Sequence, residues 1–483
     1  MQLQWSKKPC QFLQTHLRQV QPLEQTMEVR LGEELPDIGR ILCAWGQPVI
    51  RSKEWRADGM NVSGGISASI LYLPEDGSGP KKVEAWIPIQ GKWSFSQTRR
   101  EGNMRIKCCL RGIEARTISA RKMMIRANVS LLGEALEPTE VDIYMPDEIP
   151  EGVELLKNVY PVVLPREAGE KQFIVEEELQ VPNAEKWLGF TVTPELTEKT
   201  VVGNRLIMRG NGLLHYVYVD EQGMVHSAEQ QLPFAQFADL DRDYDKEATA
   251  DVMLCLSSLE AEVTDRGVRL QCGMMAQYVI WDRILLELAE DAYSSKYDIA
   301  TTEEPVTLPV ELDNRSQMVD ASCFYRDGRL IDLVFLPDHP TTYREGDMVH
   351  LNLSGVFQCL YLDGEGNMQT DTENWNDELA IAVADGGQLL ASIEGTEIHG
   401  TNAKLKINLQ TCSNQQMNMI SGISVGGARQ TDPHAPTLIL RRMDSGSLWE
   451  LAKATGSTVS DIRKANHLVE EPQEGQLLLI PVS

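Results

Sequence analysis

Short runs of alternating apolar and polar residues recur through the first 428 positions of the chain, each bounded by glycine, proline or acidic residues. A period of two is typical of β-strands with one buried face. The pattern predicts strands at residues 63–73, 83–89, 104–110, 122–130, 173–179, 205–219, 227–233, 250–263, 269–281 and 330–336. The expected fold class is therefore mainly β, built from antiparallel strands.

Some segments between these runs allow more than one interpretation. Residues 1–35 fit a short helix or an edge strand, and residues 285–293 fit a short helix or a last strand. The stretches 134–151 and 298–305 are charged, contain proline and offer few core positions. We expect both of these stretches to be linkers.

One strand-and-turn unit occurs three times. The second copy, at residues 213–223, reads Leu-Leu-His-Tyr-Val-Tyr-Val-Asp-Glu-Gln-Gly, and related runs stand at 68–77 and 357–366. Each copy has β-forming residues around a Tyr and then an acidic turn ending in Gly, the pattern of a strand entering a hairpin. The copies are separated by 146 and 143 residues, counted between their Tyr positions. This period is far longer than that of a solenoid, so it indicates tandem domains.

We therefore expect three diverged β domains followed by a different, smaller domain. A stretch rich in Gly and Pro, residues 426–436, has no apolar periodicity and predicts a flexible tether. The expected boundaries are 1–150, 151–300 and 301–428 for the β domains, 429–436 for the linker and 437–483 for the last domain.

The pattern of the last segment predicts the order strand, helix, helix, strand. Ser447 and Glu450 have the spacing of a capping box, in which each side chain satisfies a backbone amide at a helix start. Thr458 and Asp461 repeat this spacing for a second helix. Short apolar runs on either side predict two strands. The expected small domain is thus βααβ.

The net charge and the cysteine content exclude several classes of function. The 483 residues carry a formal net charge of -26, which opposes binding to nucleic acid or to an anionic lipid surface. Nine scattered cysteines without a Cys-x-x-Cys motif argue against a disulfide framework or zinc site, and Cys108-Cys109 fits a half-buried strand. No apolar segment follows Lys7-Lys8, and no apolar run reaches about 18 residues. We expect a cytosolic protein without membrane insertion, metal or cofactor.

Motifs that suggest catalysis or calcium binding lack the required context. Ser424 lies in Gly-x-Ser-x-Gly, but the residues after it cannot form the helix that a nucleophile elbow needs. The alternating carboxylates at 239–247 lack the Gly and Glu of an EF-hand loop, so a solvated acidic loop is expected. His215, within a predicted strand, is expected to be structural. The chain is therefore predicted not to be an enzyme.

The C-terminal segment resembles the LysM domain over its whole length. Residues 447–453 resemble the first helix of that family, 459–466 its second helix with the closing Asn, and 475–481 its last strand. The sequence Ser-Gly-Ser at 445–447 stands where Gly-Asp-Thr is usual. The missing Asp removes one wall of the family's glycan groove.

The three repeats resemble the SPOCS domain of spore coat proteins in endospore-forming Firmicutes. The similarity rests on Val-Tyr-Val-Asp-Glu-Gln-Gly at 217–223, His-Ser-Ala-Glu at 226–229 and Leu-Pro-Phe-Ala-Gln-Phe at 232–237. The first and third copies lack the Pro-Phe pair. Several SPOCS domains followed by one LysM domain resemble the SipL-like coat proteins.

This resemblance implies a non-enzymatic scaffold or adaptor of coat assembly, made in the mother-cell cytoplasm and placed at the forespore surface. Its LysM domain would dock on the spore morphogenetic ATPase SpoIVA, and its SPOCS domains on other coat proteins. The candidate binding residues of the LysM groove are Ser447, Leu448, Trp449, Ile462, Asn466 and Leu468.

Two alternatives stay open. Trp449 either covers the small core or anchors an interface. The competing interpretation is a protein that binds peptidoglycan or another glycan of the cell wall or cortex through its LysM domain. The missing signal segment, and the lack of a carboxylate pair or metal site for hydrolysis, disfavour that alternative.

Overall fold

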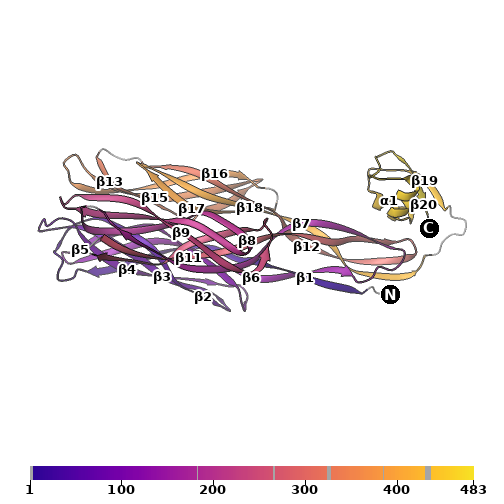
Figure 1. Cartoon of the computed structure of the whole chain (residues 1–483), viewed down its shortest axis with the longest axis horizontal. Helices are drawn as coiled ribbons and strands as arrows, with labels where there is room; N and C mark the ends of the chain where they lie inside the picture. Colours follow the sequence, from indigo (N-terminus) through magenta and orange to yellow (C-terminus); the bar gives the residue numbers. More distant parts are fainter. Residues whose placement is uncertain are drawn as a thin grey trace.

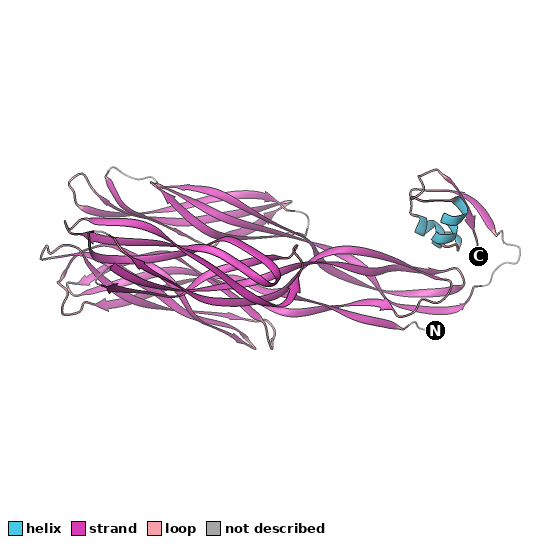
Figure 2. Cartoon of the chain, viewed as in Figure 1, coloured by secondary structure: helices cyan, strands magenta, loops and turns pink. Residues whose placement is uncertain are grey.

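The computed structural model describes residues 4–181, 183–264, 267–323, 328–383, 386–429 and 437–482. It shows an elongated molecule with a broad β body, a narrower stalk and a small helical domain at the far end of the stalk (Figure 1). Among the described residues, the only helices are two short ones in that small domain (Figure 2). The prediction of a mainly β fold is confirmed.

The body and stalk are built from three consecutive sets of strands. The first set is β1 (Trp5–Arg30), β2 (Ile38–Arg56), β3 (Gly59–Pro74), β4 (Lys81–Ser94), β5 (Asn103–Ser119) and β6 (Lys122–Pro146). The second is β7 (Val153–Leu179), β8 (Ala184–Asp220), β9 (Val225–Tyr244), β10 (Thr249–Thr264) and β11 (Gly267–Ser294). The third is β12 (Tyr297–Ser322), β13 (Arg329–Pro337), β14 (Thr341–Glu345), β15 (Met348–Leu362), β16 (Met368–Ala382), β17 (Gln388–His399) and β18 (Asn402–Ala428).

Each set forms the same two antiparallel sheets. One sheet holds the long first and last strands with the strand before the last, in the orders β1-β6-β5, β7-β11-β10 and β12-β18-β17. The other sheet is β2-β3-β4 in the first repeat, β8-β9 in the second, and β13 and β14 on β15 with β16 in the third. The segments that share the repeated turn sequence thus also share a strand topology.

Two local differences hide this common topology. The long strand β8 folds back on itself at Gly203, whose φ is 58°. Thr197 Oγ1, before this fold, donates to the Arg209 carbonyl after it. The two halves of β8 therefore take the places of β2 and β3. In the third repeat, β13 and β14 both pair with β15 and together replace β2. All three repeats therefore contain the same six-strand plan.

The acidic turn of the repeated unit closes a hairpin. In the second copy, the Asp220 carboxylate accepts hydrogen bonds from the backbone N–H groups of Gln222 and Met224, both at 2.9 Å. Asp363 makes the equivalent pair of bonds in the third copy. The bond from Met224 is the main cause that lowers the pKa of Asp220, because it stabilises the carboxylate. Gly223 takes a left-handed φ of 81°.

The glycines that lead into the unit allow neighbouring strands to approach closely. A Cβ at Gly210 would lie 2.1 Å from the Glu195 carbonyl oxygen, and a Cβ at Gly64 would lie 2.1 Å from that of Val49. We expect Gly210→Ala to destabilise the protein by about 1–3 kcal/mol, because the backbone must shift. Chemical denaturation measures the effect. Gly364→Ala is the control, since its Cβ would meet no atom within 4 Å, and equal losses in both variants would contradict the close-approach role.

The linkers expected between repeats are not present. Most of 134–151 belongs to β6, and 298–305 lies within β12. Ile143 of the first stretch faces a stalk core shared by all three repeats, which contains Cys10, Ile143, Val162, Leu164, Leu286, Leu288, Val306, Leu308, Met417 and Met419. Ile299 of the second stretch packs against a separate cluster formed by Ala292, Ile420 and Ile423. A core assembled from three distant segments leaves too few apolar residues in any one of them to be recognised in the sequence.

Other segments resolve as strands. Residues 5–30 form β1, and residues 285–293 belong to β11, so the strand alternative is correct at both places. The acidic run at 239–247 is not wholly a loop, because β9 continues to Tyr244. Residues 426–428 of the predicted tether are part of β18, which reaches Ala428, and residues 430–436 lie outside the described residues. The predicted domain boundaries themselves stay a prediction.

Candidate interaction surface on the C-terminal domain

The three repeats are joined by buried polar contacts, the first of which centres on Asp332 of β13. Its Oδ2 accepts a hydrogen bond from Trp45 Nε1 of the first repeat at 3.0 Å, and its Oδ1 lies 2.7 Å from His215 Nε2 of the second. Burial opposes the charge on each group, but the mutual attraction prevails, so the pKa of Asp332 is lowered and that of His215 is raised. His215 has the structural role expected of it.

A second cross-repeat contact centres on Arg105 of β5. The guanidinium donates to Glu134 of the same repeat at 2.7 Å and to Asp251 of the second repeat at 2.6 Å. Beside it, the Gln277 side chain bonds both the N–H and the carbonyl of Ile106, at 2.8 and 2.7 Å. Two backbone hydrogen-bonding groups on an edge strand of the first repeat thus gain a partner from a side chain of the second repeat.

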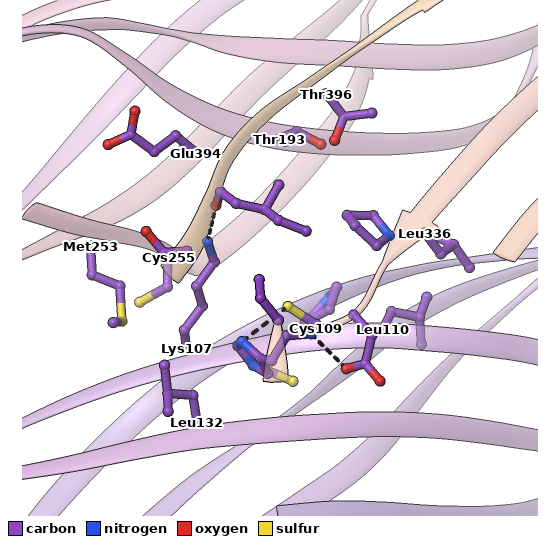
Figure 3. A pocket seen from close by; sticks show the side chains of 18 of the residues that line it. Lys107, Cys109, Leu110, Leu132, Thr193, Met253, Cys255, Leu336, Glu394 and Thr396 are labelled. Atoms are coloured by element: carbon purple, nitrogen blue, oxygen red, sulfur yellow. Dashed lines mark hydrogen bonds between the residues drawn. The ribbon is translucent and has the colours of Figure 1, made fainter. Parts of the chain in front are cut away.

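A cavity of about 570 Å³ lies where the repeats meet. Lys107 and Cys109 come from β5, Met253 and Cys255 from β10, and Leu336 from β13 (Figure 3). Lys107 Nζ crosses the junction and donates to the Ile393 carbonyl of β17 at 2.6 Å. The cavity therefore lies at a junction between repeats.

The titratable pair in this cavity is poorly suited to nucleophilic catalysis. Cys109 Sγ lies 3.8 Å from His339 Nδ1. Burial raises the pKa of Cys109 to about 11 and lowers that of His339 to about 4. Both groups are consequently neutral near pH 7, whereas a Cys–His nucleophile needs a thiolate beside an imidazolium. Cys108 and Cys109 are both half-buried, as predicted.

The other motifs singled out in the sequence take structural positions. Ser424 lies inside β18, which continues as a strand to Ala428 and so lacks the strand-to-helix turn of a nucleophile elbow. Within the described ranges, no group of three or more His, Cys, Asp or Glu side chains is placed to hold a metal ion. In the same residues, no helix is long and apolar enough to cross a membrane.

The C-terminal domain has the expected order of elements: β19 (Leu438–Arg442), α1 (Leu448–Thr455), α2 (Val459–Asn466) and β20 (Leu477–Pro481). Ser447 and Glu450 form the predicted capping box at α1. At α2, Thr458 accepts from the Asp461 amide, but the Asp461 carboxylate bonds the Thr458 hydroxyl instead of its backbone. The second cap is therefore only half of the predicted box.

The six predicted binding residues do not form one exposed groove. Leu448 and Ile462 are only 2% and 0% exposed and belong to the core of the domain, because they occupy the inward faces of the two helices. Asn466 bridges to β20, with its amide donating to the Leu479 carbonyl at 2.6 Å and accepting from the Leu479 amide at 2.7 Å.

The remaining predicted residues lie nearer the surface. Ser447 is exposed and caps α1, and Leu468 is partly buried against the core. Val469, which was not predicted, is the most exposed large apolar residue of the domain at 90%. The loop after α2, which contains Leu468 and Val469, is therefore the accessible apolar surface next to the predicted residues.

Trp449 packs against the core of the small domain and also contacts the second repeat, so each of its two predicted roles holds in part. Its Nε1 donates to Asp291 of β11 at 2.7 Å, and its ring meets that of Tyr293 edge-on at 4.7 Å. Lys453 adds bonds of 2.7 and 2.8 Å to the Asp291 carboxylate. The Tyr293 hydroxyl donates to the Ser457 carbonyl at 2.9 Å. The small domain is therefore docked on the tip of the stalk.

A comparison with known protein families matches part of the second repeat. A family model described as SipL, SPOCS domain, matches residues 183–264, which comprise β8, β9 and β10. The matched part is a minority of the chain, and it excludes the two long strands, β7 and β11, that build the stalk. No curated protein and no solved structure matches this chain.

Proposed function

We propose that this chain is a non-enzymatic scaffold of endospore coat assembly. The match of the second repeat to the SPOCS domain carries the proposal and supports a role in sporulation or the spore coat. The first and third repeats have the same strand topology, so the three would act together as coat-binding modules. Buried contacts join the repeats, which suits a rigid spacer.

The finer part of the proposal concerns the small domain. We propose that it is LysM-like and docks on the morphogenetic ATPase SpoIVA in the mother-cell cytoplasm, at the forespore surface. Its βααβ order and its helix caps support this assignment. Several modest contacts on one chain would reinforce each other through their effective concentration on a polymerised surface. The alternative is peptidoglycan or glycan binding by the same domain.

The test uses the full-length chain with a substitution in the accessible loop. Purified protein is titrated against SpoIVA and separately against peptidoglycan sacculi. We expect Val469→Arg to weaken SpoIVA binding at least about tenfold, because a charge replaces an exposed apolar contact. Val263→Arg is the matched control, since Val263 is 69% exposed on the body.

The outcome separates the two candidate functions. A fluorescent fusion of the full chain should gather at the forespore surface in sporulating cells, and Val469→Arg should reduce this localisation. Binding to sacculi alone, with no retention of SpoIVA, would replace the adaptor function by the glycan-binding alternative.

A further inference from the structure

The contact between the small domain and the stalk has the form of a peptide-binding site. Asp291 and Tyr293 are two residues apart on β11, so both side chains project from the same face of an extended strand. Trp449 and Lys453 are four residues apart on α1 and share one face of that helix. A strand segment is therefore held against a helix face.

The site discriminates by chemistry as well as shape. The Asp291 carboxylate receives both an indole N–H and an ammonium group, from Trp449 and Lys453. These bonds outweigh its partial burial and lower the pKa of Asp291. Two residues on, Tyr293 is 3% exposed, belongs to the core cluster of the small domain and reaches the Ser457 carbonyl. A carboxylate and a tyrosine at this spacing pair with Trp449, Lys453 and the Ser457 carbonyl.

We propose that this face of the C-terminal domain is a binding site for an extended protein segment with the pattern Asp-x-Tyr, and that residues 291–293 are an internal occupant which a partner displaces. The inference deepens the proposed function and rests on it for the identity of the partner. The partner presents a strand with a carboxylate and, two residues later, a tyrosine on the same face. The structure then represents the chain before it has engaged that partner.

A second Asp-x-Tyr in the chain provides an internal comparison. Asp142 and Tyr144 occupy the corresponding end of β6 in the first repeat. There, Lys7 contacts both side chains, with its Nζ 3.1 Å from the Asp142 carboxylate and 5.0 Å from the centre of the Tyr144 ring. In both copies of the pattern a lysine therefore binds the Asp carboxylate. Only the copy in the second repeat is covered by the small domain.

Internal occupancy reduces the apparent affinity for a partner by the fraction of molecules that are open. If the site is closed in about 90–99% of molecules, weakening the internal contact raises the partner's affinity roughly ten- to hundredfold. Asp291→Asn removes the carboxylate charge, and Tyr293→Phe removes the bond to Ser457 while keeping the ring in the core. The two changes together should open the site with little loss of packing.

The probe is a synthetic peptide with the sequence of residues 288–295, titrated into the full-length chain by calorimetry. We expect the Asp291→Asn/Tyr293→Phe chain to bind it at least about tenfold more tightly than the unaltered chain. Adding Lys453→Glu to the double variant should abolish binding, and so should changing the Asp of the peptide to Asn. Asp142→Asn, at the other Asp-x-Tyr, should leave binding as in the unaltered chain.

Two outcomes would overturn the inference: no binding of the peptide to the double variant, or binding that is unchanged by Lys453→Glu. Amide hydrogen exchange of α1 and α2 checks that the small domain stays folded. If the double variant loosens it, the single Asp291→Asn chain is titrated, and it must bind the peptide at least about threefold more tightly than the unaltered chain, a part of the gain expected from opening the site.

A titration with SpoIVA distinguishes this inference from the proposed function. If SpoIVA binds the unaltered and double-variant chains equally, the docking function stands and the Asp-x-Tyr site is not where it docks. If the peptide binds the double variant but SpoIVA binds neither chain, the site stands and its partner is another protein.

Discussion

Asp332→Ala is expected to lower the free energy of unfolding by about 3–5 kcal/mol, the range for removing one partner of a buried ion pair. Asp332 is 4% exposed, and it is the acceptor for one group from each of the other two repeats. Its loss leaves the Trp45 indole N–H and the Nε2 of His215 without their partner at the junction. Because these groups come from different repeats, the variant should also weaken the association of the repeats.

Denaturant unfolding followed by tryptophan fluorescence measures this effect, and Trp45 at the junction is one of the nine tryptophans that contribute to the signal. Asp320→Ala is the control, because Asp320 is an exposed residue of the same repeat. The Asp332 variant should unfold at a lower midpoint and show a broader or divided transition, as expected when domains uncouple. A shift no larger than that of the control would show that the contact does not hold the repeats together.

The pH dependence of stability is an independent readout of the same contact. The raised pKa of His215 means that its contribution is complete below the unfolded value of about 6.5 and is lost as pH rises through the folded pKa. The lowered pKa of Asp332 means that its contribution is present above about 3.9 and is lost as pH falls through the folded pKa. The difference between the unaltered chain and Asp332→Asn should therefore be largest between about pH 4 and 6.5.

The sequence contains enough local information to predict the elements within each repeat. Alternation of apolar and polar residues predicts the strands, the Asp220 turn predicts a hairpin, and Ser447 predicts the start of α1. Each of these signals depends on neighbours within a few residues, which is why it survives in a single sequence. The common topology of the repeats follows from the recurrence of the same turn.

Contacts between repeats are not visible in the same way. Asp332 and His215 are separated by 117 positions, and Trp449 and Asp291 by 158. Nothing in the local pattern distinguishes a charged residue at such a junction from one facing solvent. The same limitation explains the incorrect linkers, because the stalk strands contain many charged residues and bury only those positions that face the other repeats. Leu448 and Ile462 were misplaced for a related reason, since spacing alone does not distinguish the inner side of a small domain from its rim.

The arrangement of the repeats determines whether a structural change at the tip of the stalk, where the small domain docks, reaches the body. Three antiparallel strand pairs, β1-β6, β7-β11 and β12-β18, share the stalk core, and the small domain docks on β11, which continues into the body. A change at the tip therefore reaches a strand that also pairs with β10 at the junction. The junction contacts decide whether the body responds as one unit or as three.

Arg105→Leu most directly tests whether the junction contacts hold the three repeats together as one unit. Arg105 is 5% exposed and lies between Glu134, which is 2% exposed, and Asp251 of the second repeat. Burial works against the guanidinium charge, yet the two carboxylates raise its pKa, and Arg105 in turn lowers the pKa of Asp251. Replacement by Leu keeps much of the apolar stem but leaves Asp251 without its hydrogen-bonded cation and Glu134 with Arg18 alone.

We expect Arg105→Leu to destabilise the protein by about 3–5 kcal/mol, with part of the loss recovered at acidic pH, where the carboxylates are protonated. Arg116→Leu on the same strand is the control, because the Arg116 side chain is 74% exposed and its pair with Glu114 is worth at most about 1 kcal/mol. Combining Arg105→Leu with Asp251→Leu separates two explanations. If the charge cluster joins the repeats, the double variant should be more stable than Arg105→Leu alone, because one unpaired carboxylate is gone from the junction. If the two losses simply add, Arg105 stabilises only its own repeat through Glu134, and the repeats are held together by the Asp332 contact and their apolar seams.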